Sequence, residues 1–294
     1  MKRKVIKTLD EFNNEFTIEV YSGPHSEEKI LLNVEYDDEA DACYVPEGIS
    51  EIAEGAFKYA PFEKIVLPTS LKKLGKETFF FCRQLKEINI PPLVTEIPVG
   101  CFEYCGLESI KLPNTVLSVG AAAFADCMSL KEIKLPEGII TLRQSLFYSC
   151  KALQKIDIPN SVEIIDRFAF FSCDNLNEIH FSNSLKTIEE GAFNFCNFLY
   201  KVNLPSSLEV IKNEAFKKCE KLTSVTLNGT LNSLSEDAFP LMNEIFSIYT
   251  PHSNVEKFSF IKGVAHPPCD SLDELLQSGI TFSKANQIML SNER

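Results

Sequence analysis

One pattern of residues recurs along most of this chain at a nearly constant interval. Residues 135–157, 158–180 and 181–203 are three consecutive copies of it, each 23 residues long, and two other copies have 22. The copies begin at nine positions: Val45, Leu67, Ile90, Leu112, Leu135, Ile158, Phe181, Leu204 and Leu227. Self-similarity at a fixed period of this size is typical of solenoids, in which each repeat packs only against its neighbours.

Each copy contains a strand signal that usually ends in a proline. In the segment Leu-Lys-Glu-Ile-Lys-Leu-Pro that ends at Pro136, alternation places Ile133 and Leu135 on one face and the charged residues on the other. Proline has no backbone N–H to donate to a sheet, so Pro136 and its equivalents end the strand. Because the strand returns once per period, the sequence predicts a parallel sheet that gains one strand per coil.

The return path of each copy carries a second set of apolar residues. A pair such as Ile139 and Leu142 has the spacing of a short extended or 3₁₀ segment. A phenylalanine follows, usually after an alanine, and we expect a short helical turn there. The phenylalanines share one position of the repeat: Phe57, Phe79, Phe102, Phe124, Phe147, Phe170, Phe193, Phe216 and Phe239. Because each buried ring removes about 150–250 Å² from water, this column predicts an aromatic spine in the core.

The repeat resembles that of the BspA-like leucine-rich repeat proteins. The Leu-Pro start, the glycines at Gly75 and Gly120, the Ala-Phe step and the cysteine after it carry the resemblance over residues 45–249. The first copy departs from the pattern with Ala60 in place of cysteine, and the ninth lacks both proline and cysteine. The resemblance implies a strand-rich α/β leucine-rich repeat solenoid: a curved, right-handed stack of about nine coils of 22–23 residues. Such a stack has a parallel sheet on one face, short helical or 3₁₀ turns on the return, and end caps. It commonly serves as a recognition or adhesion surface on bacterial or protozoan cells.

The chain divides into three predicted parts: an N-terminal cap over 1–44, the solenoid over 45–249, and a C-terminal cap or tail over 250–294. The first part contains a predicted hairpin of strands at 17–21 and 29–34. The acidic stretch at 35–41 lacks the glycine turn and distal glutamate of an EF-hand, so a solvated loop is favoured over a calcium site. A capping box at Ser271 predicts a short helix in the tail.

Seven of the ten cysteines occupy one position of the repeat: Cys82, Cys105, Cys127, Cys150, Cys173, Cys196 and Cys219. Zinc ligands are usually paired two to four residues apart, which this spacing does not provide. Disulfides between neighbouring coils are the alternative, but equivalent side chains in a ladder point the same way instead of converging. We therefore favour free, buried thiols that pack as small hydrophobes and donate weakly to a backbone carbonyl at the turn. Ten unpaired thiols fit a reducing compartment.

The charge and the patterning of the chain exclude several function classes. A formal charge of −12 argues against nucleic acid as a partner. No run approaches 18 apolar residues, so no membrane insertion is expected. The residues after Lys4 do not form the apolar core of a secretory signal, which predicts a cytoplasmic protein; a cell-surface protein exported by a non-Sec route is the alternative.

The sequence shows no catalytic motif. It has four histidines, and it lacks a glycine-rich phosphate loop, a G-x-S-x-G elbow and an H-E-x-x-H helix. We therefore predict that the protein is not an enzyme and needs no cofactor and no metal.

Two sets of residues are candidates for an interaction surface. The first is the polar face of the predicted sheet: Glu87, Asn89, Lys111, Glu132, Lys134, Lys155, Asp157, Glu178, His180, Lys201 and Asn203. The second is an aromatic patch between the phenylalanine and cysteine positions, which we expect to lie mostly in the core: Tyr59, Phe80, Phe81 and Tyr104. These surfaces predict a non-catalytic module that recognises a protein, or alternatively a glycan. A structural or oligomerising element of an intracellular scaffold is the second hypothesis, and the chain is expected to be a monomer or a weak homodimer.

Overall fold

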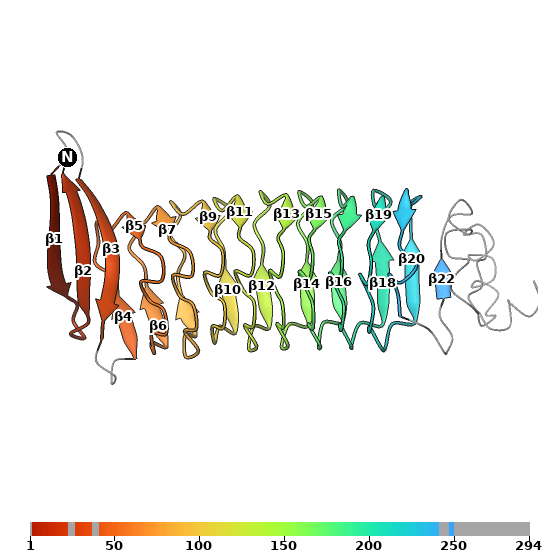
Figure 1. Ribbon diagram of the computed structural model, residues 1–294, viewed down its shortest axis with the longest axis horizontal. Helices are drawn as coiled ribbons and strands as arrows, with labels where there is room; N and C mark the ends of the chain where they lie inside the picture. Colours follow the sequence, from red (N-terminus) through yellow and green to blue (C-terminus); the bar gives the residue numbers. More distant parts are fainter. Residues whose placement is uncertain (1, 23–26, 37–40, 241–246, 250–294) are drawn as a thin grey trace, which may run out of the picture.

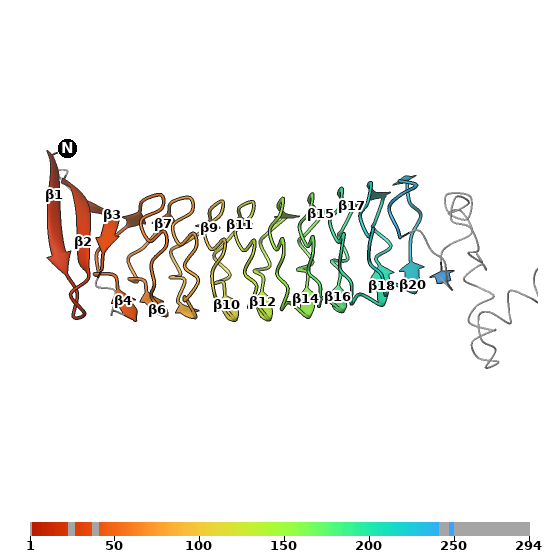
Figure 2. The ribbon, with the colours of Figure 1, turned by 60° about the horizontal axis from the view of Figure 1, so that its bottom comes forward.

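A computed structural model describes residues 2–22, 27–36, 41–240 and 247–249. Over these ranges the chain winds into a solenoid of about nine coils, which stand in one row beside an N-terminal antiparallel sheet (Figures 1 and 2). Each coil contributes two short strands, one to each of two parallel ladders. The predicted leucine-rich repeat solenoid with parallel sheets is therefore confirmed.

The front ladder is built from the strand that the Leu-x-x-Ile pattern predicts. Its strands are β4 (Ala42–Tyr44), β6 (Lys64–Val66), β8 (Glu87–Ile88), β10 (Ser109–Lys111), β12 (Glu132–Lys134), β14 (Lys155–Asp157), β16 (Glu178–His180), β18 (Lys201–Leu204), β20 (Ser224–Leu227) and β22 (Ser247–Tyr249). Paired strands run parallel and in register, as Ile110 opposite Ile133 shows. Both of these residues are buried, while Lys111 and Lys134 beside them are exposed.

The return ladder uses the second apolar pair of each copy. Its strands are two residues long: β5 (Glu51–Ile52), β7 (Lys73–Leu74), β9 (Glu96–Ile97), β11 (Ser118–Val119), β13 (Thr141–Leu142), β15 (Ile164–Ile165), β17 (Thr187–Ile188), β19 (Val210–Ile211) and β21 (Ser233–Leu234). The pairing therefore selects the extended form of this segment over the 3₁₀ form.

The front ladder has three interruptions. Among the described strands, no backbone pairing joins β8 to β10, β12 to β14 or β16 to β18. At each interruption the return ladder remains paired, through β9–β11, β13–β15 and β17–β19 respectively. The coils therefore stay stacked while the outer side of the front ladder is divided into short, separately paired groups of strands.

The prediction of a helical turn around each core phenylalanine is wrong, because no helix occurs in the described ranges. Residues with positive φ flank the phenylalanine, such as Ser145 (φ 56°) and Ser149 (φ 54°) around Phe147. A left-handed residue cannot continue a right-handed helix. The N–H groups of these three residues instead donate to carbonyl oxygens of the next coil at 2.7–3.0 Å.

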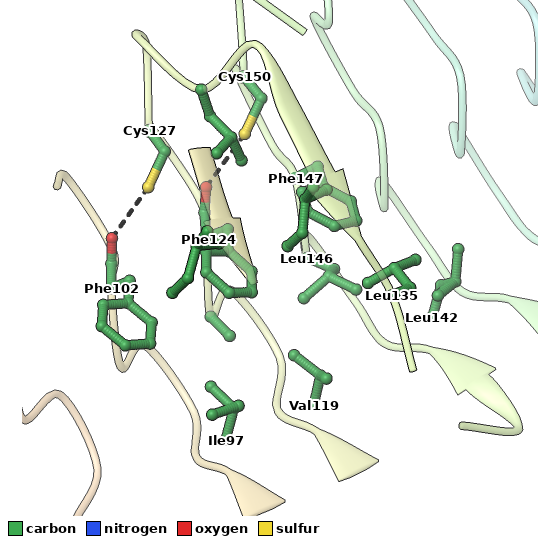
Figure 3. Packing of buried hydrophobic residues seen from close by; sticks show 14 of the residues in the cluster. Ile97, Phe102, Val119, Phe124, Cys127, Leu135, Leu142, Leu146, Phe147 and Cys150 are labelled. Atoms are coloured by element: carbon green, nitrogen blue, oxygen red, sulfur yellow. Dashed lines mark hydrogen bonds between the residues drawn. The ribbon is translucent and has the colours of Figure 1, made fainter. Parts of the chain in front are cut away.

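The phenylalanines form the predicted spine. Successive rings of the spine lie 5.0–5.8 Å apart between centroids, and all nine are buried. Figure 3 shows part of this column, with Phe102, Phe124 and Phe147 at equivalent positions of three coils and aliphatic residues of the return ladder beneath them. Offset and tilted aromatic stacks of this kind are stabilised beyond the burial of their area.

The N-terminal sheet closes one end of this core. Its strands β1 (Lys2–Leu9), β2 (Glu15–Ser22) and β3 (Glu27–Glu35) are antiparallel, and β3 pairs in parallel with β5 of the first coil. Phe16, Ile18 and Leu31 are buried in the same core as the spine. Strand β1 was not predicted from the sequence. Residues 37–40 of the acidic stretch and the helix predicted at Ser271 lie outside the described residues, and the division into three parts stays a prediction.

Candidate interaction surfaces

The front face is the outer side of the front ladder, and it carries all eleven polar residues proposed from the sequence. Every one of them is exposed. Asn89 also has a structural role, because its amide group accepts from the Leu67 N–H at 2.7 Å and donates to the Leu67 carbonyl at 2.9 Å. These two bonds extend the pairing of β6 and β8 by one residue beyond β8, so Asn89 is held by the preceding coil.

Ion pairs neutralise parts of the front face, and they join coils whose strands are paired. Lys64 contacts Glu87 at 3.1 Å between β6 and β8, and Lys131 contacts Glu108 at 2.6 Å beside β10 and β12. Because these side chains are exposed, each pair contributes at most about 1 kcal/mol. Among the described residues, no front-face ion pair crosses an interruption of the ladder.

Four charged residues on β14 and β16 form a local network. His180 Nδ1 lies 2.6 Å from Asp157 Oδ1, and its Nε2 lies 3.1 Å from Glu178 Oε1. Lys155 contacts Glu178 at 2.9 Å. The lysine hydrogen bond and charge lower the pKa of the Glu178 carboxyl, while the carboxylate raises the pKa of Lys155. The network satisfies its own charges at the surface, and no serine, threonine or cysteine side chain of the described ranges is hydrogen-bonded to it.

A groove of about 800 Å³ runs across β10, β12 and β14, over one of the interruptions. Lys111 and Lys134 line it from directly opposite positions of β10 and β12. Like charges in opposite positions of a sheet repel each other. Within the described part of the chain neither ammonium has an ion-pair partner. Glu132 and Glu137 line other parts of the same groove.

The aromatic patch proposed from the sequence lies at the surface of the turns. Tyr59 is 57% exposed, and Phe80, Phe81 and Tyr104 are half-buried. The four rings contact one another with centroid separations of 5.3–6.0 Å. Lys58 Nζ lies 4.4 Å from the centroid of Phe80, where a cation is attracted to the ring face.

A second aromatic cluster lies further along the same turns. Tyr148 stacks on Phe171 at 5.0 Å, and Phe168 and Phe195 contact Phe171 edge-on at 5.7 and 5.3 Å. Phe168 was not predicted to belong to an aromatic patch, because no local sequence pattern indicates that a bulky residue adopts a φ of 57°. Its ring lies against the backbone of the next coil at Gly191, where a Cβ atom would stand 2.5 Å from Phe168 Cε1. The sequence does contain one indication of this packing, because Gly191 lies one repeat period after Phe168.

The described cysteines are free and buried, which confirms the interpretation of the thiols as core residues. Each thiol of the repeat position donates to the carbonyl of the spine phenylalanine one coil earlier, as Cys127 does to Phe102 at 3.0 Å and Cys150 to Phe124 at 3.1 Å (Figure 3). Burial raises the pKa of the Cys127 thiol to about 12, so this side chain is a poor nucleophile.

The described ranges contain no group of three or more metal-ligating side chains. No helix there has the length and apolar character needed to cross a bilayer.

Several solved structures are similar to this chain. A leucine-rich repeat protein from Bacteroides ovatus superposes with a TM-score of 0.64 at 20% sequence identity, over 88% of this chain and 76% of that one. A leucine-rich repeat protein from Eubacterium ventriosum gives 0.48 at 13% identity, over 90% and 85%. A leucine rich cell surface protein from Faecalibacterium prausnitzii gives 0.44 at 17% identity, over 87% and 97%. The first likeness shows the fold.

The sequence comparison identifies the repeat itself. Among curated proteins none matches this sequence. The family described as BspA type leucine rich repeat region (6 copies) matches residues 50–156 and 140–262, which is most of the chain. A family of this kind implies a repeat scaffold for protein interaction. The chain belongs to the BspA-type leucine-rich repeat proteins.

Proposed function

We propose that this chain is a non-catalytic recognition module that binds a protein partner on its front face. The observation that carries the proposal is the groove over β10, β12 and β14, where Lys111 and Lys134 lie opposite each other without an ion-pair partner in the described structure. At two other positions of this face, the ladder places a lysine directly opposite a carboxylate: Lys64 opposite Glu87 and Lys155 opposite Glu178. A carboxylate of the partner between the two ammonium groups would relieve their repulsion and gain two charge-assisted hydrogen bonds.

A peptide suits this groove better than a glycan. The residues that line it are aliphatic, charged, amide-bearing or, at Ser109, hydroxyl-bearing, and none of them is aromatic. Aromatic side chains supply much of the lining of small-molecule sites. An extended chain with alternating side chains instead matches a surface made of parallel strands.

The non-catalytic part of the proposal rests on the chemistry of the possible nucleophiles. Burial raises the pKa of the Cys127 and Cys173 thiols, which holds these side chains in their thiol form. The exposed His180 is held between two carboxylates without a nucleophile beside it. Free thiols in such number also support a reducing, cytoplasmic location over export, which we include in the proposal.

Charge reversal on the front face tests the proposal. The partner is recovered from native cells by quantitative co-purification with the tagged full chain, the Lys111→Glu/Lys134→Glu variant, or the Lys72→Glu/Lys212→Glu control. The control lysines are exposed next to the return ladder, and the described structure gives them no ion pair. We expect the partner to be lost from the first variant and retained by the control. Equal recovery with both variants would contradict binding at the groove.

A further inference from the structure

The turn face is a second continuous surface, formed by the two residues that follow each spine phenylalanine. Unlike the front ladder, its backbone is joined from coil to coil without a break. The N–H of the second residue donates to the carbonyl of the first residue in the next coil, from Tyr59 to Phe80 at 2.9 Å as far as Phe195 to Lys217 at 3.0 Å. Side chains on this face are therefore presented at a fixed spacing.

Two aromatic clusters occupy this face. The first cluster comprises Tyr59, Phe80, Phe81 and Tyr104. The second comprises Tyr148, Phe171 and Phe195, together with Phe168, which lies two residues before a spine phenylalanine and packs against Phe171. Tyr59 and Phe195, at the outer ends, are 57% and 39% exposed. Rings that stay at the surface in contact with each other give a large apolar area with little rotamer entropy to lose on binding.

Two carboxylates lie between the clusters. Burial, followed by repulsion from Asp126 and Glu77, raises the pKa of Glu103, and burial raises the pKa of Asp126. The nearest lysines are engaged elsewhere, since Lys58 contacts Glu77 at 2.9 Å and Lys151 lies 3.9 Å from Asp174. Asp126 accepts a hydrogen bond from the Tyr104 hydroxyl, but in the described structure neither Glu103 nor Asp126 has an ion-pair partner. The centre of the turn face therefore carries negative charge that no ion pair neutralises.

We propose that the turn face binds an extended segment of a protein partner in which one lysine or arginine is flanked on both sides by apolar side chains. The cation lies at Glu103 and Asp126, and the apolar side chains lie on the two clusters. Phe80 and Phe171 are four coils apart, which corresponds to about 19 Å at the spacing of neighbouring strands. A segment in the polyproline II conformation covers this distance in about six residues, and its three residues per turn place every third side chain on the same face. The motif is therefore apolar-x-x-basic-x-x-apolar.

A second copy of the chain fits this face less well. A two-fold axis that places the first cluster of one copy on the second cluster of the other passes near Asp126. The carboxylates of Glu103 and Asp126 would then face the same groups of the other copy. The cations of the first cluster are already committed, since Lys58 and Arg83 lie 4.4 and 4.1 Å from the centroids of Phe80 and Phe81.

Selection of random peptides displayed on phage against the immobilised full chain tests this inference. We expect enrichment of the apolar-x-x-basic-x-x-apolar motif, and binding of a synthetic peptide with this motif that falls about tenfold in Glu103→Gln/Asp126→Asn. These substitutions preserve side-chain shape, and circular dichroism checks that the variant is folded. The groove variant Lys111→Gln/Lys134→Gln should bind the peptide as the parent does, so the two surfaces are tested separately.

Several results would overturn the inference. These are the absence of any enriched motif, enrichment of acidic peptides, or motif binding that Glu103→Gln/Asp126→Asn leaves unchanged. If only the groove variant loses peptide binding, the peptide binds on the front face and not on the turn face. That result would leave the proposed function unaffected. Sedimentation showing a dimer that Tyr59→Ser dissociates would assign the turn face to a second copy instead.

Discussion

Replacement of one spine phenylalanine should remove a large part of the stability of the solenoid. Phe170 is fully buried, and its ring stacks at 5.2 Å on Phe147 and at 5.0 Å on Phe193. Truncation of a buried phenylalanine to alanine costs about 3–5 kcal/mol. Each lost aromatic contact costs about 0.5–1.5 kcal/mol beyond burial. Because hydrogen bonds between coils hold the backbone on both sides, the cavity cannot collapse. We therefore expect Phe170→Ala to cost about 5 kcal/mol, at the upper end of the range.

Urea unfolding followed by far-ultraviolet circular dichroism measures this loss, since the chain contains no tryptophan to report by fluorescence. Phe198→Ala is the matched control, because its ring is 40% exposed and contacts a lysine ammonium at the surface. The control should cost less than about 1 kcal/mol. A loss below about 2 kcal/mol for Phe170→Ala, or one equal to the control, would refute the view that the spine carries the core.

Three other substitutions and treatments test separate parts of the account. Gly191→Ala should cost about 2 kcal/mol by urea unfolding, because residue 191 has φ of 61° and a Cβ would stand 2.5 Å from Phe168. Adding Phe168→Ala should restore part of that loss, and strict additivity would contradict the steric explanation. The nine described thiols should resist iodoacetamide in the folded protein at about pH 8 and react once urea exposes them, as mass spectrometry can show; rapid labelling of the native protein would contradict their burial. The raised pKa of Glu103 means that its charged form destabilises the folded state. This loss of stability is present at neutral pH and disappears as pH falls through that pKa. Glu103→Gln should therefore stabilise the protein by up to about 1 kcal/mol at neutral pH and by less in acid. Equal effects at both pH values would contradict this sign.

The repeat period and its apolar columns were enough to predict the fold. A fixed interval places each strand beside its equivalent, and alternation assigns residues such as Ile110 to the core and Lys111 to the surface. The column of phenylalanines predicted the spine, and the spacing of the cysteines predicted free thiols that bond to turn carbonyls. These features depend on position within one coil, which the sequence shows directly.

The turns were not predictable in the same way. Ala122, Ser145, Phe168 and Glu214 adopt positive φ although their residue types rarely do. In Ala122, Ser145 and Phe168 the backbone N–H donates to a carbonyl oxygen of the next coil. Because these bonds lie between coils, no local sequence pattern predicts the conformation. The pairing of charges is equally non-local, because many lysines and carboxylates alternate on the front face. The repeat interval already places Lys134 beside Lys111, but only the structure shows that neither ammonium has an ion-pair partner among the described residues.

Site-specific photo-crosslinking in native cells tests the central claim most directly. A photoreactive phenylalanine analogue replaces Ser109 or Glu137 in the groove, or Lys72 or Lys212 beside the return ladder, and each full-length variant is irradiated before lysis. The account predicts that one protein is captured from both groove positions and from neither control position. Capture of that protein from Lys72 or Lys212, or no adduct from the groove positions, would contradict recognition on the front face.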